Sequence, residues 1–260
     1  MGKKKLKVIK IGGNIIDDQM KLKDFLKSFA KLKGPKILVH GGGKLASKMA
    51  KKMNVPVEMI EGRRVTNAET LDIITMVYAG KINKNIVAQL QANNCNTIGF
   101  SGADGNTIIA KKRPVNEIDY GFVGDIVKVE VSVIKLLLIN NLSILFCAIS
   151  HDRKGQLFNT NADTIASELA IALSKDFEVE LYYCFEKNGV LKDIHDDSSV
   201  IEKIDQKNYI TFKEQGIISD GMIPKLDNCF YALEKKVKKI CIGKPEMLFD
   251  KNIKFTKIHK

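Results

Sequence analysis

Short apolar runs alternate with amphipathic stretches along most of this chain, which is the pattern of parallel βαβ units. The apolar runs predict strands over residues 5–11, 37–40, 142–149, 179–184 and 239–242. The stretches with helical spacing predict helices over residues 20–31, 44–53, 68–93, 162–174 and 224–235. Residues 96–114 predict two further strands around an Asp104–Gly105 turn, and residues 121–131 predict another strand or a hairpin.

Together these elements predict an α/β protein with one continuous, open and mostly parallel sheet that carries helices on both faces. A chain of 260 residues with 45% hydrophobic content can bury a core of that size. The sequence shows no internal repeat, low-complexity tract or linker. We therefore expect a single domain over residues 1–260.

Apolar content and cysteine usage predict a cytoplasmic protein. No apolar run reaches the ~18–20 residues of a membrane span, and the opening MGKKKLKV has lysines where a secretory signal is apolar. The five cysteines are far apart and lie mostly in apolar segments, so we expect reduced core residues rather than disulfides or metal ligands. They are Cys95, Cys147, Cys184, Cys229 and Cys241.

The formal net charge of +12 suggests anionic partners. Of the 42 basic residues, however, only four are arginine: Arg63, Arg64, Arg113 and Arg153. Arginine makes most bidentate contacts to bases, and no basic stripe is interleaved with aromatic residues, so we expect no nucleic-acid partner. The lysine surplus predicts a solvated surface and leaves open that part of it attracts phosphorylated ligands.

Two glycine clusters follow neighbouring strands of the predicted sheet. Gly12 and Gly13 come after the first strand, and Gly41, Gly42 and Gly43 come after the second. Open α/β sheets bind ligands at the carboxyl ends of their strands, and a backbone without Cβ lets N–H groups approach an anion. Such glycines can also simply form the turns. Two clusters at adjacent strand ends favour a phosphate or carboxylate site.

Two better-known phosphate-binding motifs are absent. The sequence HGGGK is not a P-loop, because Leu38 stands where the motif has its first glycine and Leu45 stands where it has Ser or Thr. No G-x-G-x-x-G follows the first strand, so a dinucleotide-binding dehydrogenase lacks its main motif.

The starts of two predicted helices carry polar or charged side chains that capping of the helix does not require. Asn159, Asn161 and Asp163 stand at alternate positions around a helix start that requires one cap. Lys225 lies in the first turn of the last predicted helix, where the helix dipole disfavours a cation. The plain interpretations are a cap and a surface lysine. The functional interpretation puts a ligand beside the asparagines and pairs Lys225 with Lys10 around phosphoryl oxygens.

These stretches together resemble the amino acid kinase superfamily and, within it, the acetylglutamate kinases. The resemblance covers nearly the whole chain and rests on KIGG at residues 10–13, VHGGGK at 39–44, GRRVT at 62–66, NTNADTIA at 159–166 and GIISDGMIPK at 216–225. It implies a three-layer sandwich, the amino acid kinase fold. It also implies transfer of the γ-phosphate of ATP, with Mg²⁺, to the side-chain carboxylate of an N-acylglutamate such as N-acetyl-L-glutamate, an early step of arginine synthesis.

The resemblance also implies roles for single residues. Lys10 and Lys225 would neutralise the transferring phosphoryl group from either side, and Asp163 would hold both ammonium groups in place. No general base is needed, because the attacking carboxylate is already ionised, and no side-chain metal ligand is implied. The residues that would bind the acyl-amino acid, under a hairpin lid over 55–66, are Gly42, Gly43, Arg64 and Asn159, with Arg64 on the α-carboxylate.

The family also divides the chain into two lobes. Residues 1–175 would bind the acyl-amino acid and residues 176–260 would bind ATP. The residues implied to contact phosphate or nucleotide are Gly12, Gly13, Glu186, Lys187, Asn188, Gly189, Val190, Leu191, Ile217, Ile218 and Ser219. We expect a homodimer paired through residues 68–93. Arginine-inhibited members carry a helix ahead of the first strand, and about five residues stand there in this sequence, so we also expect insensitivity to arginine.

Three alternatives remain open. Residues 146–150 differ from the family pattern, so an acyl group other than acetyl, such as succinyl, would be tolerated or preferred. A kinase for another amino acid would have to explain GRRVT without an acylated substrate. A non-catalytic nucleotide-binding member would not need Lys10, Asp163 and Lys225 together.

Overall fold

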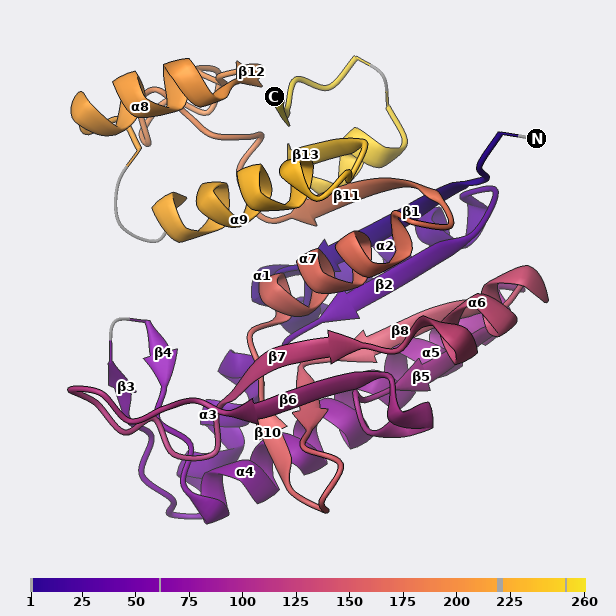
Figure 1. The fold of residues 1–260 in the computed structure, drawn as a ribbon, viewed down its shortest axis with the longest axis vertical. Coiled ribbons are helices and arrows are strands. Elements are labelled where there is room, and N and C mark those ends of the chain that lie inside the picture. Colours follow the sequence, from indigo (N-terminus) through magenta and orange to yellow (C-terminus); the bar gives the residue numbers. More distant parts are fainter. Residues whose placement is uncertain (1, 61, 219–221, 251) are drawn as a thin grey trace.

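The computed structural model describes residues 2–60, 62–218, 222–250 and 252–260, and its centre is a sheet of eight strands (Figure 1). The strands lie in the order β12-β14-β13-β11-β1-β2-β8-β5, and most neighbours run parallel. Their bounds are β1 (Lys5–Ile11), β2 (Lys36–His40), β5 (Thr97–Phe100), β8 (Ser143–Cys147), β11 (Glu178–Cys184), β12 (Lys203–Ile204), β13 (Lys239–Gly243) and β14 (Thr256–Ile258).

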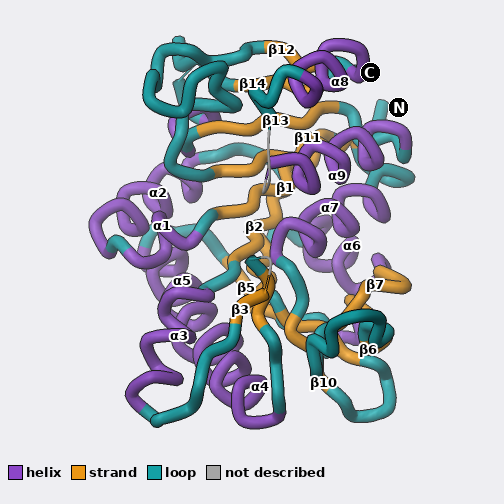
Figure 2. The backbone as a smooth tube through the Cα atoms, turned by 90° about the vertical axis from the view of Figure 1, so that its left-hand side faces the viewer, coloured by secondary structure: helices purple, strands orange, loops and turns teal. Residues whose placement is uncertain are grey.

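Helices cover both faces of this sheet, which confirms the predicted α/β sandwich (Figure 2). One face carries α1 (Gly13–Asp17), α2 (Gln19–Lys31), α3 (Gly43–Lys52) and α5 (Asn83–Ala92). The other carries α6 (Val131–Ile139), α7 (Ala162–Leu173) and α9 (Met222–Glu234), and α8 (Gln206–Glu214) lies near β12. The sequence starts several of these helices with a side-chain cap, such as Asp18 on α2 and Asn161 on α7.

A second sheet corrects the expectation of one continuous sheet. It has the order β10 (Leu157–Asn159), β9 (Ile149–His151), β6 (Ile108–Lys112), β7 (Gly124–Val129). The predicted strand 142–149 is divided between β8 and β9, and the two strands around Asp104–Gly105 belong to different sheets. The chain turns where the Gly102 N–H donates to the Ile149 carbonyl at 2.7 Å, and a Cβ on Gly102 would lie only 2.8 Å from that oxygen.

Two helices, α6 and α8, do not follow from the sequence pattern. Helix α6 is nearly all apolar and α8 is short and polar, so neither shows a clear amphipathic period.

Two other predicted elements are present in the structure. The hairpin expected over 55–66 contains β3 (Met59–Ile60) and β4 (Arg63–Arg64). The predicted helix 68–93 is one helical stretch made of α4 (Ala68–Thr75), a π-helical segment (Met76–Ile82) and α5.

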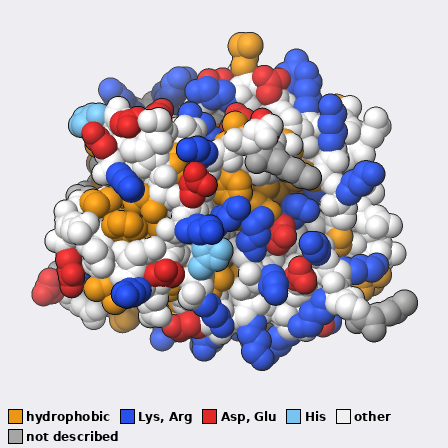
Figure 3. Space-filling model, turned by 90° about the horizontal axis from the view of Figure 1, so that it is seen from above, with side chains coloured by type: hydrophobic (Ala, Val, Ile, Leu, Met, Phe, Trp, Pro, Cys, Tyr) orange, Lys and Arg blue, Asp and Glu red, His pale blue; other side chains and the backbone are white. Residues whose placement is uncertain are grey.

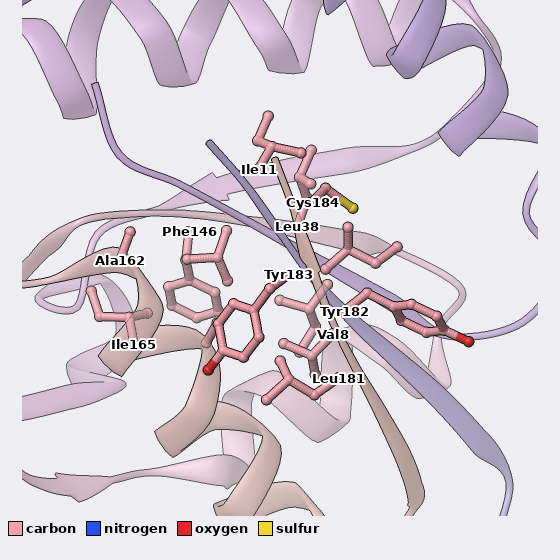
Figure 4. Packing of buried hydrophobic residues seen from close by; sticks show 14 of the residues in the cluster. Val8, Ile11, Leu38, Phe146, Ala162, Ile165, Leu181, Tyr182, Tyr183 and Cys184 are labelled. Atoms are coloured by element: carbon pink, nitrogen blue, oxygen red, sulfur yellow. The ribbon is translucent and has the colours of Figure 1, made fainter. Parts of the chain in front are cut away.

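The central strands are apolar on both faces because both faces are covered by helices. All residues of β2 and β8 are buried. Tyr182 and Tyr183 of β11 point to opposite sides of the sheet, and Tyr183 lies on the side of Ala162 and Ile165 (Figure 4). The five cysteines are buried and free, as predicted.

Charged side chains are spread over the face of the molecule that Figure 3 shows. On the face in Figure 3, lysine and arginine side chains are interspersed with acidic and neutral ones. Within the described residues, no helix has both the length and the apolar character that a membrane crossing requires.

Candidate active site

Three charged side chains meet beyond the carboxyl end of β1. Lys10 is the penultimate residue of β1, Asp163 lies in the first turn of α7, and Lys225 lies in the first turn of α9. The Lys10 Nζ is 2.7 Å from the Asp163 Oδ1, and the Lys225 Nζ is 3.2 Å from the Asp163 Oδ2. Each side chain is less than one-fifth exposed. The three residues proposed to act together therefore form one ion-pair cluster, and Lys225 is not a surface lysine.

The carboxylate of Asp163 stays ionised in this cluster. Burial by itself would raise its pKa, but the nearby Lys10 and Lys225 ammonium groups outweigh burial and hold the pKa at about 2. Among the described residues, the buried Oδ1 has only its ion pair and no geometrically good hydrogen bond. One negative charge shared by two cations leaves a net positive charge, which suits an incoming anion.

Two aromatic rings fix the position of Lys225. Its Nζ lies 5.6 Å from the ring centroids of both Tyr183 and Phe185, within the range of cation–π attraction. The Tyr183 hydroxyl donates to the Asp163 carbonyl oxygen at 3.2 Å. The end of β11 thus supports both Lys225 and the start of α7.

Gly12 and Gly13 leave space beside this cluster. Gly12 donates its N–H to the Cys184 carbonyl at 3.0 Å, which ties the turn to β11. A Cβ on Gly13 would meet only the Asp17 Oδ2, at 3.5 Å, and a Cβ on Gly12 would make ordinary contacts. Packing of the protein does not require glycine here, so the space that these glycines leave fits a phosphate group close to the backbone.

A cavity of about 290 Å³ brings together Gly42, Gly43, Arg64 and Asn159, the four residues expected to bind the acyl-amino acid. Residues Asn161, Ala162 and Thr164 at the start of α7 also line this cavity. Asp163 lies between them in the chain, so the cavity and the ion-pair cluster share one helix terminus.

Arg64 is 9% exposed, and one of its terminal nitrogens makes two hydrogen bonds. Its Nη2 donates to the Gly43 carbonyl at 3.0 Å and to the Ser47 Oγ at 2.7 Å. Asn159 donates through Nδ2 to the Thr66 Oγ1 at 3.1 Å. These bonds orient a guanidinium and an amide on the wall of one small cavity, an arrangement that can bind a carboxylate and an amide.

The residues expected to contact the nucleotide lie in several separate places. Val190 and Leu191 are buried, and the Val190 N–H donates to the Thr256 Oγ1 at 2.8 Å, so their side chains belong to the core. Lys187 pairs with Asp197 at 2.8 Å. Asn188 donates to the Asp197 carbonyl at 2.9 Å.

The remaining expected nucleotide residues lie apart from that loop. Glu186 lines a different cavity, of about 510 Å³, whose described lining includes neither Ile217 nor Ile218. Ile218 is buried and its N–H bonds to the Phe212 carbonyl at 3.1 Å. Ser219 lies outside the described residues. In the described residues, the structure does not gather this set into one cavity.

Some residues that shape the site were not among the predicted site residues. Thr66 is fully buried, and its hydroxyl accepts the hydrogen bond from Asn159. Tyr78 lies on the cavity wall. Asn161 is the N-cap of α7 and accepts from the Asp163 N–H at 2.7 Å, so it positions the helix that carries Asp163. Asn161 was visible as a cap candidate. Tyr78 had no local signal, because its place follows from the path of the helix.

Comparison with known proteins decides the family. The model of the Amino acid kinase family matches residues 5–244. The chain belongs to the amino acid kinase family. This amino acid kinase is 52% identical to the acetylglutamate kinase of Cytophaga hutchinsonii, over 95% of this chain and 94% of that protein. It is 39% identical to the chloroplastic acetylglutamate kinase of Arabidopsis thaliana, over 78% of this chain and 57% of that protein.

Solved structures share its fold. The crystal structure of smu.665 from Streptococcus mutans is 25% identical, with a TM-score of 0.77, over 97% of this chain and 98% of that chain. N-acetylglutamate synthase from Neisseria gonorrhoeae, solved with coenzyme A and N-acetyl-glutamate, has a TM-score of 0.83 at 19% identity, over all of this chain and 60% of that chain. The second likeness concerns the fold alone.

Proposed function

We propose that this amino acid kinase transfers the γ-phosphate of ATP to the side-chain carboxylate of N-acetyl-L-glutamate, as an early step of arginine biosynthesis. The observation that carries the proposal is the shared helix start of α7. It joins the Lys10–Asp163–Lys225 cluster to the cavity that holds Arg64 and Asn159. The names of the similar acetylglutamate kinases support the same reaction.

In this proposal the protein positions two anions and neutralises charge. Arg64 pairs with the α-carboxylate of the acyl-amino acid, Asn159 hydrogen-bonds to it, and Gly42 and Gly43 form the floor beneath it. Lys10 and Lys225 stabilise the negative charge on the oxygens of the phosphoryl group while this group passes from ATP to the acceptor carboxylate. Asp163 keeps both ammonium groups in place. Gly12 and Gly13 leave room for those oxygens.

ATP supplies the phosphoryl group when bound, and Mg²⁺ screens the charge of its phosphates. Asp163 is already paired with two lysines. In the described residues, no group of three or more His, Cys, Asp or Glu side chains could hold a metal ion. We therefore propose that Mg²⁺ is held chiefly by the nucleotide phosphates and water.

Release of ADP with a panel of acceptors tests the function. The purified protein is assayed with N-acetylglutamate, N-succinylglutamate, free glutamate and aspartate, each with and without Mg²⁺. We expect Mg²⁺-dependent turnover of an N-acylglutamate and poor turnover of free glutamate. Equal or better turnover of aspartate or free glutamate would place the protein elsewhere in the family, and ATP binding without turnover would support a non-catalytic member.

A second candidate substrate carries an additional carboxylate on its acyl group, as succinyl does. Arg63 and Arg113 line the same cavity as Arg64, so three of the four arginines in the chain surround it. Arg113 is oriented by Asp125, with Nε and Nη2 donating to one carboxylate oxygen at 3.0 and 2.7 Å. N-acetylglutamate offers one carboxylate besides the reacting one, so the additional guanidinium groups suit a more acidic acyl group.

Competition between the two N-acylglutamates decides between these substrates. If a dicarboxylic acyl group is preferred, kcat/KM for N-succinylglutamate exceeds that for N-acetylglutamate. Arg113→Ala then lowers kcat/KM for the succinyl compound about tenfold and leaves the acetyl compound nearly unchanged. A clear preference for acetyl in the unaltered protein rejects this candidate.

We also propose the two-lobe arrangement. Most residues that line the acyl-amino acid cavity come from residues 1–175, with Asn228 as a contribution from the remainder of the chain. Hydrogen exchange with each ligand added singly checks the division. N-acylglutamate should protect amides mainly within 1–175, and a non-hydrolysable ATP analogue should protect amides mainly within 176–260.

We further propose a cytoplasmic homodimer. Five free and buried cysteines fit a reducing compartment. The strand β5 forms one end of the central sheet, and Ile98 on it is 36% exposed. Such an edge presents unpaired backbone groups and an apolar side chain, which a second copy can cover.

A further inference from the structure

A buried pair of polar side chains lies beneath the glycine turn of the acyl-amino acid cavity. His40 is the last residue of β2 and is 0% exposed, and Asn83 is the first residue of α5 and is 1% exposed. The Asn83 Nδ2 lies 3.3 Å from the His40 Nε2, and the His40 Nδ1 lies 2.7 Å from the Gly41 carbonyl oxygen. Neither residue lines the cavity itself.

The partners decide the tautomer of His40. The Gly41 carbonyl can only accept, so the Nδ1 carries the proton and donates to it. The Nε2 is then an acceptor and receives an N–H from Asn83. Complete burial lowers the pKa of His40 to about 4, so the ring is neutral at physiological pH, as this arrangement requires.

Asn83 is itself held in place by two neighbouring strands. Its Nδ2 lies 3.3 Å from the Leu145 carbonyl of β8, and its Oδ1 accepts from the Lys84 Nζ at 3.2 Å. The same ammonium donates to the Gly99 carbonyl of β5 at 3.2 Å. A Cβ on Gly99 would lie 1.9 Å from the Asn83 Oδ1, so glycine at this position makes room for the amide.

The helical segment before Asn83 touches the glycine turn directly. Gly42 has a φ of +155°, and a Cβ there would lie 2.2 Å from the Ile82 Cδ1 and 3.1 Å from the Tyr78 ring. Tyr78 and Ile82 both belong to the π-helical segment. Its wider i→i+5 turns bring Tyr78, Ile82 and Asn83 to one side of the helix, and such segments are frequent at functional sites.

We infer that His40 and Asn83 are positioning residues for the acyl-amino acid, which set the direction of the Gly41 peptide and therefore of the Gly42 and Gly43 backbone that forms the floor of the cavity. This inference deepens the proposed function and rests on it for the identity of the ligand. The pair acts through the turn and touches neither the substrate nor the phosphoryl group.

Steady-state kinetics of Asn83→Ala and His40→Leu test the inference. Each should raise KM for the N-acylglutamate about tenfold and leave KM for ATP within about twofold, because only the acyl-amino acid rests on this turn. His40→Asn keeps an amide donor near the place of Nδ1 and should restore most of the affinity. The matched control is Leu90→Val, a change at a fully buried apolar site on the same helix. It should lower the melting temperature and leave both KM values unchanged.

A second measurement keeps the inference independent of the proposed reaction. Amide NMR of the ligand-free protein should show shifted resonances for residues 41–43 in Asn83→Ala and His40→Leu, but not in Leu90→Val. Unchanged resonances there, or a KM for the acyl-amino acid equal to that of the unaltered protein, would overturn the inference. If the proposed function is wrong, the result is different. The unaltered protein then shows no turnover of N-acylglutamate, while the NMR shifts in the two variants are still present.

Discussion

At the scale of single residues, the site depends on one carboxylate shared by two lysines. A lone buried Asp would be costly to ionise, but Lys10 and Lys225 hold the pKa of Asp163 at about 2. The same sharing fixes both ammonium groups before the substrates arrive. Preorganised charge of this kind is most effective in the transition state, where it costs no further reorganisation.

Replacement of either lysine should therefore act on kcat. We predict that Lys10→Ala and Lys225→Ala each lower kcat by roughly 100-fold or more, the effect of losing one preorganised electrostatic contact. Single-turnover rates with saturating substrates measure this. Lys207→Ala, at an exposed lysine of α8, is the control and should have normal kcat. Near-normal kcat in Lys225→Ala would reduce that residue to a structural role.

The neutral state of His40 predicts a pH dependence of stability. Its pKa is about 4 in the folded protein and near 6.5 when exposed in the unfolded chain. Below pH 6.5 the unfolded chain binds a proton that the folded protein does not, so His40 destabilises the fold increasingly as the pH falls from 6.5 to 4. This difference in the pKa of His40 corresponds to a loss of ~3 kcal/mol of folding stability once the pH lies below both values.

Urea unfolding at pH 7 and at pH 4.5 checks this dependence. His40→Asn removes the titrating group and should lose less stability over that interval than the unaltered protein. His259→Asn, at an exposed histidine, should follow the unaltered protein. Identical losses in His40→Asn and in the unaltered protein would contradict the prediction.

At the scale of elements, the glycine turn and the helix that supports it form one unit. The π-helical segment packs Ile82 and Tyr78 so closely on Gly42 that no side chain fits there. The backbone of the cavity floor at Gly42 therefore combines a φ of +155° with direct contact to this helix.

Two glycine replacements in this unit should have opposite outcomes. Gly42→Ala adds a Cβ at a φ of +155° and in contact with Ile82, so we predict a lower melting temperature and a raised KM for the acyl-amino acid. Gly80→Ala adds a methyl group into open space within the same helical stretch and should leave KM unchanged, with equal or slightly higher stability. Thermal unfolding and steady-state kinetics compare them, and normal behaviour of Gly42→Ala would show that the turn yields easily.

At the scale of the whole molecule, the sheet ends on one side at β5, next to the helical stretch proposed to pair in a dimer. Ile98 on β5 and Met76 in the π-helical segment are exposed apolar side chains on these two elements. A second copy would bury them and cover the free backbone groups of the edge.

A charge placed on this edge should prevent pairing. We predict by light scattering a dimer for the unaltered protein and a monomer for Ile98→Lys, because a buried lysine without a partner is costly. Val127→Lys, at an exposed apolar site on the second sheet, is the control and should stay dimeric. A monomeric unaltered protein would reject the proposed interface.

Local patterns in the sequence were enough to predict most of the elements and their order along the chain. Strand β1 spans the predicted residues, and β2, β11, β13, α3 and α7 lie close to prediction, because strand and helix periods and caps are local properties. The resemblance of the motifs to the family also predicts Lys10, Asp163, Lys225 and Arg64 as parts of one site. Glycine turns after two neighbouring parallel strands have to meet at one edge of the sheet, so their proximity followed from the strand order.

Contacts between distant segments of the chain produce the features that no local pattern predicts. The division between β8 and β9, the second sheet and the meeting of Thr66 with Asn159 follow from packing across many residues, for which no local period exists. Burial shows the same limit, since the side chains of Val190 and Leu191 lie in the core, and their contact with a nucleotide stays a prediction. The π-helical segment, which places Tyr78 and Asn83 beneath the glycine turn, lies inside a stretch predicted as one ordinary helix, and only its backbone hydrogen bonds in the folded protein distinguish it.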